Sequence, residues 1–211
     1  MAANIDIKVL KPFGPSVAKI EIPEQMLKDL NEYVDEIIKD EDKSKILDHG
    51  KTLAGNVKQE FKLEPDFIKS SGFGSFLSTA TRKWIEISQN QKITKFSIKS
   101  SWIVRQFENE YNPVHHHSGH VSGVGYLKVP EHLGDISTKK KTNDKGRLTL
   151  IHGSVNLFSK ATYVIKPVVG EFYLFPNYLL HTVYPFTDTN EERRSISFNA
   201  NLDRYSASYN T

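Results

Sequence analysis

The sequence predicts a mainly β protein with helices near its N-terminus, an α+β chain whose second half is a sandwich or jelly roll. Two amphipathic patterns of helical period lie before residue 95, and from about Thr94 onward the apolar residues alternate with period two. Many short strands that no helix separates favour two packed antiparallel sheets, and the open end of such a fold can hold a ligand.

The first 95 residues are expected to form a helical support that begins with a hairpin. Residues 5–10 and 17–22 alternate like short strands around the Pro-Phe-Gly-Pro turn at 12–15. Pro23 suits the first turn of a helix, because its fixed φ fits that position, and apolar residues then recur at helical spacing over 26–38.

Two further features complete this N-terminal region. The charged run at 40–43, Asp-Glu-Asp-Lys, is expected to end the first helix in a solvated turn. A second helical pattern follows Gly74, and its apolar face is predicted to comprise Leu77, Ala80, Trp84 and Ile87. Both helices are interpreted as packing elements.

Residues 96–211 are expected to form the jelly-roll core, so that 1–211 is a single domain. The strand-like runs are 98–107, 121–129, 147–151, 162–166, 171–175, 181–184 and 195–201. Residues 134–146, with three lysines at 139–141, are predicted to form a mobile basic loop. This loop is either a solvated insertion or a clamp for an acidic or extended partner.

Composition excludes several classes of protein. The formal charge of +3, from 28 basic and 25 acidic residues, is too balanced to indicate nucleic acid as a partner. Without cysteine the chain has no disulfide framework, thiolate metal site or cysteine nucleophile. No segment approaches the roughly 20 apolar residues of a membrane span, and no signal peptide is apparent. The expectation is a soluble cytoplasmic protein.

The stretch NPVHHHSGHVSGVG, residues 112–125, holds four of the eight histidines. Because alternate side chains of a strand share a face, His115 and His117 are predicted to point the same way and His116 the other way. Two imidazoles so placed can bind one metal ion. A histidine-rich loop can equally be merely solvated, and this stretch alone leaves both interpretations open.

Two later stretches strengthen the metal-site interpretation. In FPNYLLHTVYPF, residues 175–186, His181 follows a Phe-Pro turn and precedes another strand. In EERRSISFNAN, residues 191–201, Arg193 and Ser195 share a strand face, and arginine is a bidentate partner of carboxylates. This face is therefore predicted to bind an acidic cosubstrate. For Arg194 a surface ion pair with a neighbouring glutamate is the simpler interpretation.

Together, NPVHHHSGHVSGVGYLKVP (112–130), FPNYLLHTVYPF (175–186) and ERRSISFNAN (192–201) resemble the Fe(II)- and 2-oxoglutarate-dependent oxygenases, specifically their prolyl-hydroxylase-like bacterial and phage branch. The resemblance implies a double-stranded β-helix, the cupin-like jelly roll. It also implies a dioxygenase that uses Fe(II), 2-oxoglutarate and O₂, with ascorbate as an optional addition. The reaction would hydroxylate a substrate, with a peptidyl proline as the candidate, and release succinate and CO₂.

The resemblance carries over to individual residues. His115 is similar to the family's first iron ligand and His181 to its distal histidine. Arg193 matches the basic residue that pairs with the far carboxylate of 2-oxoglutarate, and Ser195 completes an Arg-x-Ser arrangement. Tyr126 falls where many relatives place a tyrosine that hydrogen-bonds the same carboxylate.

His117 departs from the family pattern, which has Asp or Glu at this position and so gives two histidines and a carboxylate. The favoured interpretation is a three-histidine iron site of His115, His117 and His181. His120, or an acid such as Glu110, is the alternative third ligand. Zinc in place of iron, or loss of activity, also remains open.

Two rival functions stay open. One is a three-histidine cupin-like metalloenzyme that does not use 2-oxoglutarate, and the other is a noncatalytic jelly-roll binding module. The substrate, whether peptide, protein or small molecule, is not determined by the sequence. Four aromatic residues are candidates either for the wall of a pocket or for the core: Trp102, Phe175, Tyr184 and Phe198.

Overall fold

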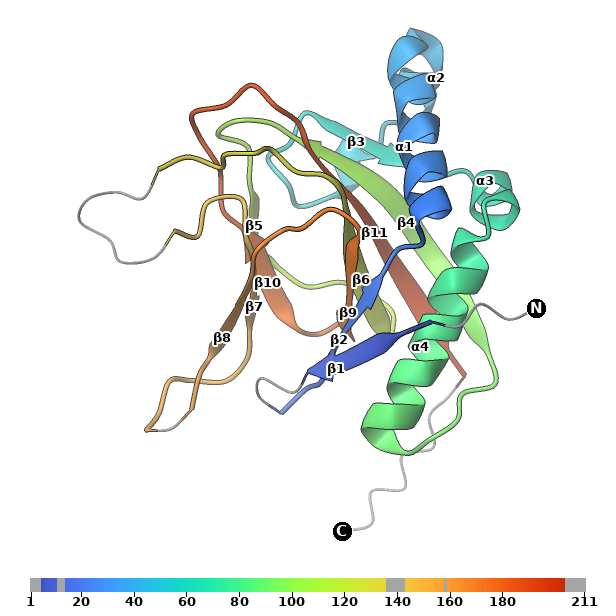
Figure 1. Cartoon of the computed structure of the whole chain (residues 1–211), viewed down its shortest axis with the longest axis vertical. Coiled ribbons are helices and arrows are strands. Elements are labelled where there is room, and N and C mark those ends of the chain that lie inside the picture. Colours follow the sequence, from blue (N-terminus) through green and yellow to red (C-terminus); the bar gives the residue numbers. More distant parts are fainter. Residues whose placement is uncertain (1–4, 11–13, 136–142, 158, 204–211) are drawn as a thin grey trace.

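The computed structural model describes residues 5–10, 14–135, 143–157 and 159–203, which build two antiparallel sheets packed face to face (Figure 1). The larger sheet has the strand order β1 (Ile7–Leu10), β2 (Val17–Glu21), β9 (Glu171–Pro176), β6 (Val121–Lys128), β11 (Arg193–Leu202), β4 (Phe96–Gln106) and β3 (Gln59–Lys62). The smaller has the order β5 (Asn112–His115), β10 (Leu180–Val183), β7 (Leu148–Ile151) and β8 (Thr162–Ile165). The predicted jelly-roll class is confirmed.

The helices precede most of the strands, and α1 and α4 cover the outer face of the larger sheet (Figure 1). They are α1 (Glu24–Lys39), α2 (Glu41–Leu47), a 3₁₀ turn η1 (Gly50–Thr52), α3 (Pro65–Ser70) and α4 (Phe73–Gln89). α1 and α4 coincide with the two predicted helical patterns. One position is wrong, because Ile87 near the end of α4 is 55% exposed rather than part of the buried face.

The prediction of a solvated turn at 40–43 is also wrong, since α2 begins there. The Asp40 side chain accepts hydrogen bonds from the backbone N–H groups of Asp42 and Lys43, both at 3.0 Å. A carboxylate in this N-cap position satisfies donors that have no partner within the helix, and it contributes about 1 kcal/mol. The acidic run therefore starts a new helix.

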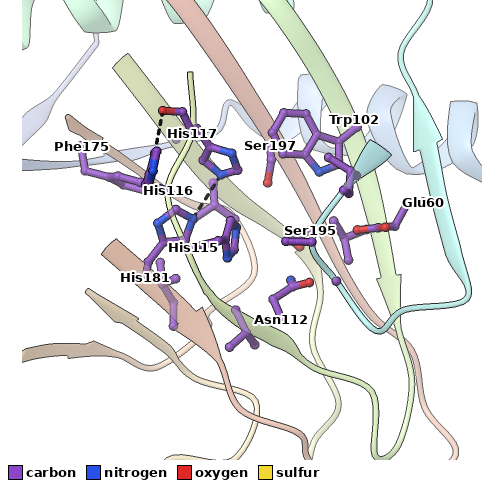
Figure 2. Close-up of a pocket in the computed structure, with 18 of the residues that line it drawn as sticks. Glu60, Trp102, Asn112, His115, His116, His117, Phe175, His181, Ser195 and Ser197 are labelled. Carbon is purple, nitrogen blue, oxygen red and sulfur yellow. Dashed lines mark hydrogen bonds between the residues drawn. The ribbon is translucent and has the colours of Figure 1, made fainter. Parts of the chain in front are cut away.

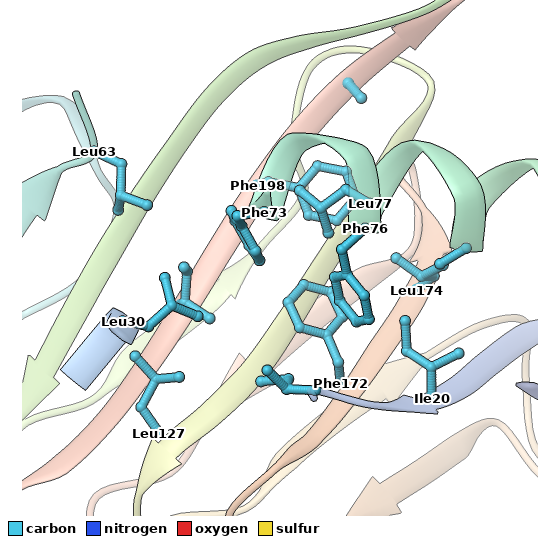
Figure 3. Close-up of a cluster of buried hydrophobic side chains, with 14 of the residues drawn as sticks. Ile20, Leu30, Leu63, Phe73, Phe76, Leu77, Leu127, Phe172, Leu174 and Phe198 are labelled. Carbon is cyan, nitrogen blue, oxygen red and sulfur yellow. The ribbon is translucent and has the colours of Figure 1, made fainter. Parts of the chain in front are cut away.

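Alternation along the strands divides the apolar residues between two cores. Phe172 of β9 and Phe198 of β11 face the helices, where Phe73 and Phe76 of α4 pack edge-on against Phe172 with ring centroids 6.2 and 6.0 Å away (Figure 3). Tyr173, the next residue of β9, and Phe175 point to the other face of the larger sheet and pack against the smaller sheet. The helix-facing core fixes the larger sheet, and the space between the sheets remains for a site.

Some elements were not predicted. β3, β5 and α3 are short and carry no clear period. Pairing with β4 specifies β3, and pairing with β10 specifies β5. The N-terminal hairpin is present, with Leu10 opposite Val17, although residues 11–13 of its turn lie outside the described part of the chain. So do the three lysines predicted in the basic loop. No helix in the described ranges is long and apolar enough to cross a membrane.

Candidate active site

Three histidines from the smaller sheet and its adjoining loop converge at one point between the sheets. β5 and β10 are antiparallel neighbours that put His115 directly opposite His181. His117, two residues after His115, is tied to the β9–β10 turn, because its backbone N–H donates to the Asn177 carbonyl at 3.1 Å. The ligand nitrogens of the three rings all lie within 4.8 Å of one another (Figure 2).

Hydrogen bonds orient two of these rings. Nδ1 of His115 lies 2.7 Å from the Pro113 carbonyl oxygen, and Nδ1 of His181 lies 2.9 Å from that of Leu179. Because a carbonyl only accepts, each Nδ1 carries the proton and donates, which leaves the Nε2 lone pair free. This is the tautomer that a metal-binding histidine needs, held by a backbone partner.

Burial keeps the three imidazoles neutral. Desolvation lowers the pKa of His117 to about 3, with His181 and His115 adding like-charge repulsion, and it lowers the pKa of His181 to about 4. The pKa of His115 is also lowered, mainly by burial. Metal ligands must be deprotonated, so near pH 7 all three side chains are ready to bind without losing a proton.

The donor set fits a divalent transition metal. Nε2 of His117 and Nε2 of His181 are 3.1 Å apart. With metal–nitrogen bonds of about 2.1 Å, two adjacent ligands of one ion are separated by roughly this distance. Imidazole nitrogen suits iron as well as zinc. The three histidines therefore offer a ligand set for such an ion, with small side-chain adjustments bringing all three nitrogens to bonding distance.

The two alternative third ligands lie outside this cluster. His120 uses Nδ1 to accept a hydrogen bond from the backbone N–H of Leu202 at 2.9 Å. The carboxylate of Glu110 accepts from the backbone N–H groups of Lys58 and Phe107, at 3.2 and 2.9 Å, and so holds a turn. Neither joins the group of histidines that the structure brings together.

Arg193 lies in the same cavity with its charge uncompensated. Its side chain points inward from β11 and is almost fully buried, with 1% exposed. Nε donates to the Gly146 carbonyl at 3.0 Å and Nη1 to Oε1 of Gln106 at 3.2 Å, so neutral groups fix the guanidinium. Burial lowers the pKa of Arg193. Within the described residues no carboxylate pairs with it, which is the arrangement expected of a site for an anion.

Tyr126 lies behind this guanidinium and does not line the cavity itself. The guanidinium carbon of Arg193 is 5.1 Å from the centre of the Tyr126 ring, in cation–π contact. Burial raises the pKa of Tyr126 to about 12, against the opposing charge of the neighbouring Arg193. Ser195 is directly opposite Tyr126 in the strand register and lines the cavity.

The next residue, Arg194, points to the other face of the sheet. It donates to Glu192 at 2.6 and 3.1 Å and to Asp35 of α1 at 2.6 Å. The predicted ion pair with a neighbouring glutamate is thus present, with Glu192, but the arginine is not at the surface, since only 1% of it is exposed. The two adjacent arginines therefore have different roles. Arg194 is held by carboxylates of the fold, and Arg193 is available to a ligand.

The cavity has a volume of about 180 Å³ and joins the histidines to Arg193. His116 also touches it, although its own ring is exposed. Of the four aromatic candidates, Trp102 and Phe175 line the cavity, Phe198 lies in the helix-facing core, and Tyr184 is 52% exposed.

Sequence reasoning missed several polar residues of this site. Ser197 continues the inward alternation of Arg193 and Ser195, and that period could have revealed it. Gln106, which orients Arg193, could have been found as the inward end of a predicted strand. No sequence signal marks Asn112 or Glu60, since both come to the cavity through unpredicted short strands.

Comparison with known proteins identifies this arrangement. Residues 100–199 match the family model described as "Putative 2OG-Fe(II) oxygenase", where 2OG is 2-oxoglutarate. This β-rich region belongs to the 2OG-Fe(II) oxygenase family. The matched segment runs from β4 to β11 and contains the three histidines and Arg193. The protein is thus a 2-oxoglutarate-dependent oxygenase, as the resemblance predicted.

Solved structures share the fold of this oxygenase at low sequence identity. A Pseudomonas putida prolyl-4-hydroxylase matches with a TM-score of 0.57 and 15% identity, over 90% of this chain and 92% of that one. The viral collagen prolyl hydroxylase of Paramecium bursaria Chlorella virus-1, in a 2OG complex, matches with a TM-score of 0.54 and 17% identity over 87% and 94%. No curated protein sequence matches the oxygenase.

Proposed function

We propose that this oxygenase holds Fe(II) on His115, His117 and His181, binds 2-oxoglutarate with Arg193, and hydroxylates a peptidyl proline with release of succinate and CO₂. The observation that carries the proposal is a single cavity with three neutral imidazoles in one wall and a buried arginine without a carboxylate partner in another. A dicarboxylate that chelates a metal through one end and pairs with a cation through the other matches both features.

When bound, the iron supplies the redox chemistry that couples decarboxylation of 2-oxoglutarate by O₂ to hydroxylation of a C–H bond. The chain positions the reactants and excludes water. Arg193 receives the far carboxylate through charge-assisted hydrogen bonds, with Ser195 beside it. Gln106 and the Gly146 carbonyl hold the guanidinium in place. The Arg193 side chain therefore loses little conformational entropy when the cosubstrate binds.

A three-nitrogen ligand set changes the charge of the centre. With His117 in place of the family's carboxylate, the metal keeps one more positive charge, which favours the dianionic cosubstrate. The edge of the Trp102 ring packs against His117 at 5.4 Å between centroids, and Phe175 packs against His181 at 5.2 Å. These rings shield the histidines from water and fix their planes.

Proline in a peptide is the proposed substrate on the strength of fold similarity. The solved structures of similar fold include prolyl hydroxylases, among them one from Trichoplax adhaerens in complex with a hypoxia inducible factor peptide, with a TM-score of 0.52 and 12% identity. Fold alone is a weak guide to substrate, so this element of the proposal needs its own test.

The test incubates the protein with Fe(II), 2-oxoglutarate, O₂ and a panel of short proline-containing peptides. Succinate is measured by NMR and oxygen incorporation by mass spectrometry with ¹⁸O₂. Wild type and His120→Ala are expected to produce succinate and a labelled hydroxyproline. His117→Ala is expected to produce neither product. Succinate without peptide labelling would refute proline as the substrate. Activity retained in His117→Ala and lost in His120→Ala would refute the ligand set.

A further inference from the structure

A carboxylic acid is buried in the cavity and has no role in holding metal or cosubstrate. Glu60 of β3 is 2% exposed and lines the cavity together with Trp102 and Asn112. Its Oε2 has no hydrogen-bond partner among the described residues. In Figure 2, Glu60 and Trp102 lie across the cavity from His181. The group of histidines that can share one ion does not include this carboxylate.

The strand register fixes where this acid lies. Ser195 of β11 is opposite Val104 of β4, and Val104 is opposite Glu60 of β3, so the three residues form one row across the larger sheet. Neighbouring strands are about 4.8 Å apart, which puts the Glu60 backbone roughly 10 Å from that of Ser195. Glu60 therefore borders the part of the cavity that 2-oxoglutarate, held between the histidines and Arg193, leaves to a substrate.

The charge of this carboxylate is not balanced by the protein. No lysine, arginine or histidine of the described chain forms an ion pair with Glu60, whereas Glu110 and Asp48 lie close enough to repel its negative charge. Burial, and then these two acids, raise the pKa of Glu60 to about 7. An unpaired buried carboxylate is unfavourable, and a cation brought by a ligand relieves both the desolvation and the repulsion.

The surroundings of Glu60 suit an organic cation. Trp102 is two residues before Val104 and faces the same side of β4, and an indole ring is the best aromatic partner for a cation. The loop after η1 closes over this corner. A Cβ added at Gly55 would lie 2.3 Å from Oδ1 of Asn112 and 3.3 Å from Oε1 of Glu60, so only glycine allows this approach. The corner is a built recess and not open solvent.

We propose that Glu60 is a substrate-recognition residue that pairs with an ammonium or guanidinium group of the substrate, beside the ring of Trp102. This inference rests on the proposed function to the extent that the cavity receives a substrate. It narrows the peptide substrate to one with a lysine, an arginine or a free amino terminus near the hydroxylated residue. A neutral partner that accepts a hydrogen bond from protonated Glu60 is the competing outcome.

The test uses metal-free protein with ¹³C-labelled glutamate carboxyls, in which the Glu60 resonance is assigned from its loss in Glu60→Gln. n-Butylammonium chloride and uncharged n-butanol are titrated at pH 7.5. The ammonium is expected to shift the Glu60 resonance and to lower its titration midpoint. Binding to both proteins is followed through the Trp102 indole N–H resonance, and it is expected to be at least about tenfold weaker in Glu60→Gln. Glu36→Gln, on the exposed face of α1, is the control and is expected to match wild type.

Three results would overturn the inference: butanol and butylammonium acting alike, unchanged ammonium binding in Glu60→Gln, or a Glu60 resonance that neither probe moves. If Glu60→Gln does not fold, the wild-type midpoint with and without the ammonium still decides. Because no iron or 2-oxoglutarate is present, a negative result leaves the proposed oxygenase site standing. Conversely, if the proposed iron and 2-oxoglutarate site proved wrong, the titration of Glu60 with butylammonium would still show whether this residue binds a cation.

Discussion

Replacement of Arg193 by glutamine should weaken 2-oxoglutarate binding selectively. The guanidinium is 1% exposed, and no carboxylate among the described residues competes for it. A charge-assisted hydrogen bond in such a site contributes about 1.5–3 kcal/mol. Since about 1.4 kcal/mol corresponds to tenfold, the dissociation constant should rise roughly 10- to 150-fold. Arg193→Gln keeps an uncharged donor on a shorter side chain, so the loss reports the charge together with the reach of the guanidinium.

The assay is calorimetric titration of Mn(II)-loaded protein with 2-oxoglutarate and, separately, with pyruvate. Pyruvate keeps the 2-oxo acid that chelates a metal and lacks the far carboxylate, so its affinity should be the same in wild type and Arg193→Gln. Lys99→Gln removes an exposed cation that only reaches Ser118 Oγ at 2.8 Å, and it should behave as wild type. Equal loss of both ligands, or no loss of either, would refute the role of Arg193.

Three further changes have defined outcomes. His117→Ala should lower Fe(II) affinity by more than about 100-fold, because loss of a residue that merely orients a metal ligand already costs about 10- to 100-fold. His120→Ala should keep the affinity of wild type, and both are measured by anaerobic competition with a chelator. Glu192 is partly buried, which alone would raise its pKa, but hydrogen bonds from two arginines hold the pKa below its usual 4.5. Its contribution to stability is present above that value and lost as pH falls through the lowered pKa, so Glu192→Gln should flatten the decline in melting temperature with acidification below about pH 5. Asp40→Ala should lower the free energy of unfolding by about 1 kcal/mol in urea, with an unchanged m-value.

Each of these three has a contradicting result. Fe(II) affinity lost in His120→Ala and kept in His117→Ala would exchange the two histidines in the ligand set. A pH profile of Glu192→Gln that is parallel to wild type would show that this carboxyl is ionised alike in the folded and unfolded states. An unchanged urea midpoint in Asp40→Ala would mean that tertiary contacts, and not the cap, hold the start of α2.

The sequence predicted the site better than its surroundings, for a physical reason. Alternation in a strand puts Arg193 and Ser195 on one face regardless of length or partners, and the same rule separates Arg193 from Arg194. That His115 and His181 meet depends on the pairing of β5 with β10, which are 66 residues apart in the chain. Local pattern does not encode such pairing, and only the family resemblance indicated it.

The errors also have physical causes, some local and some from distant partners. A run of acidic residues is typical of a solvated turn, yet Asp40 at the head of that run also fits an N-cap, and the cap decided the outcome. The pair of Arg194 with Glu192 is local and could be predicted, whereas the burial of this arginine depends on Asp35 of α1, which is 159 residues away in the sequence. Glu60 escaped notice because β3 is short, and only its pairing with β4 brings it to the cavity.

The central claim is that His115, His117 and His181 form an iron site that binds 2-oxoglutarate. Its most direct test is anaerobic visible absorption of the protein with Fe(II) and 2-oxoglutarate, comparing wild type with His117→Ala. We predict a metal-to-ligand charge-transfer band in wild type that is absent in His117→Ala. Wild-type protein that binds Fe(II) but gives no band with 2-oxoglutarate, or a band that persists in His117→Ala, would contradict the claim.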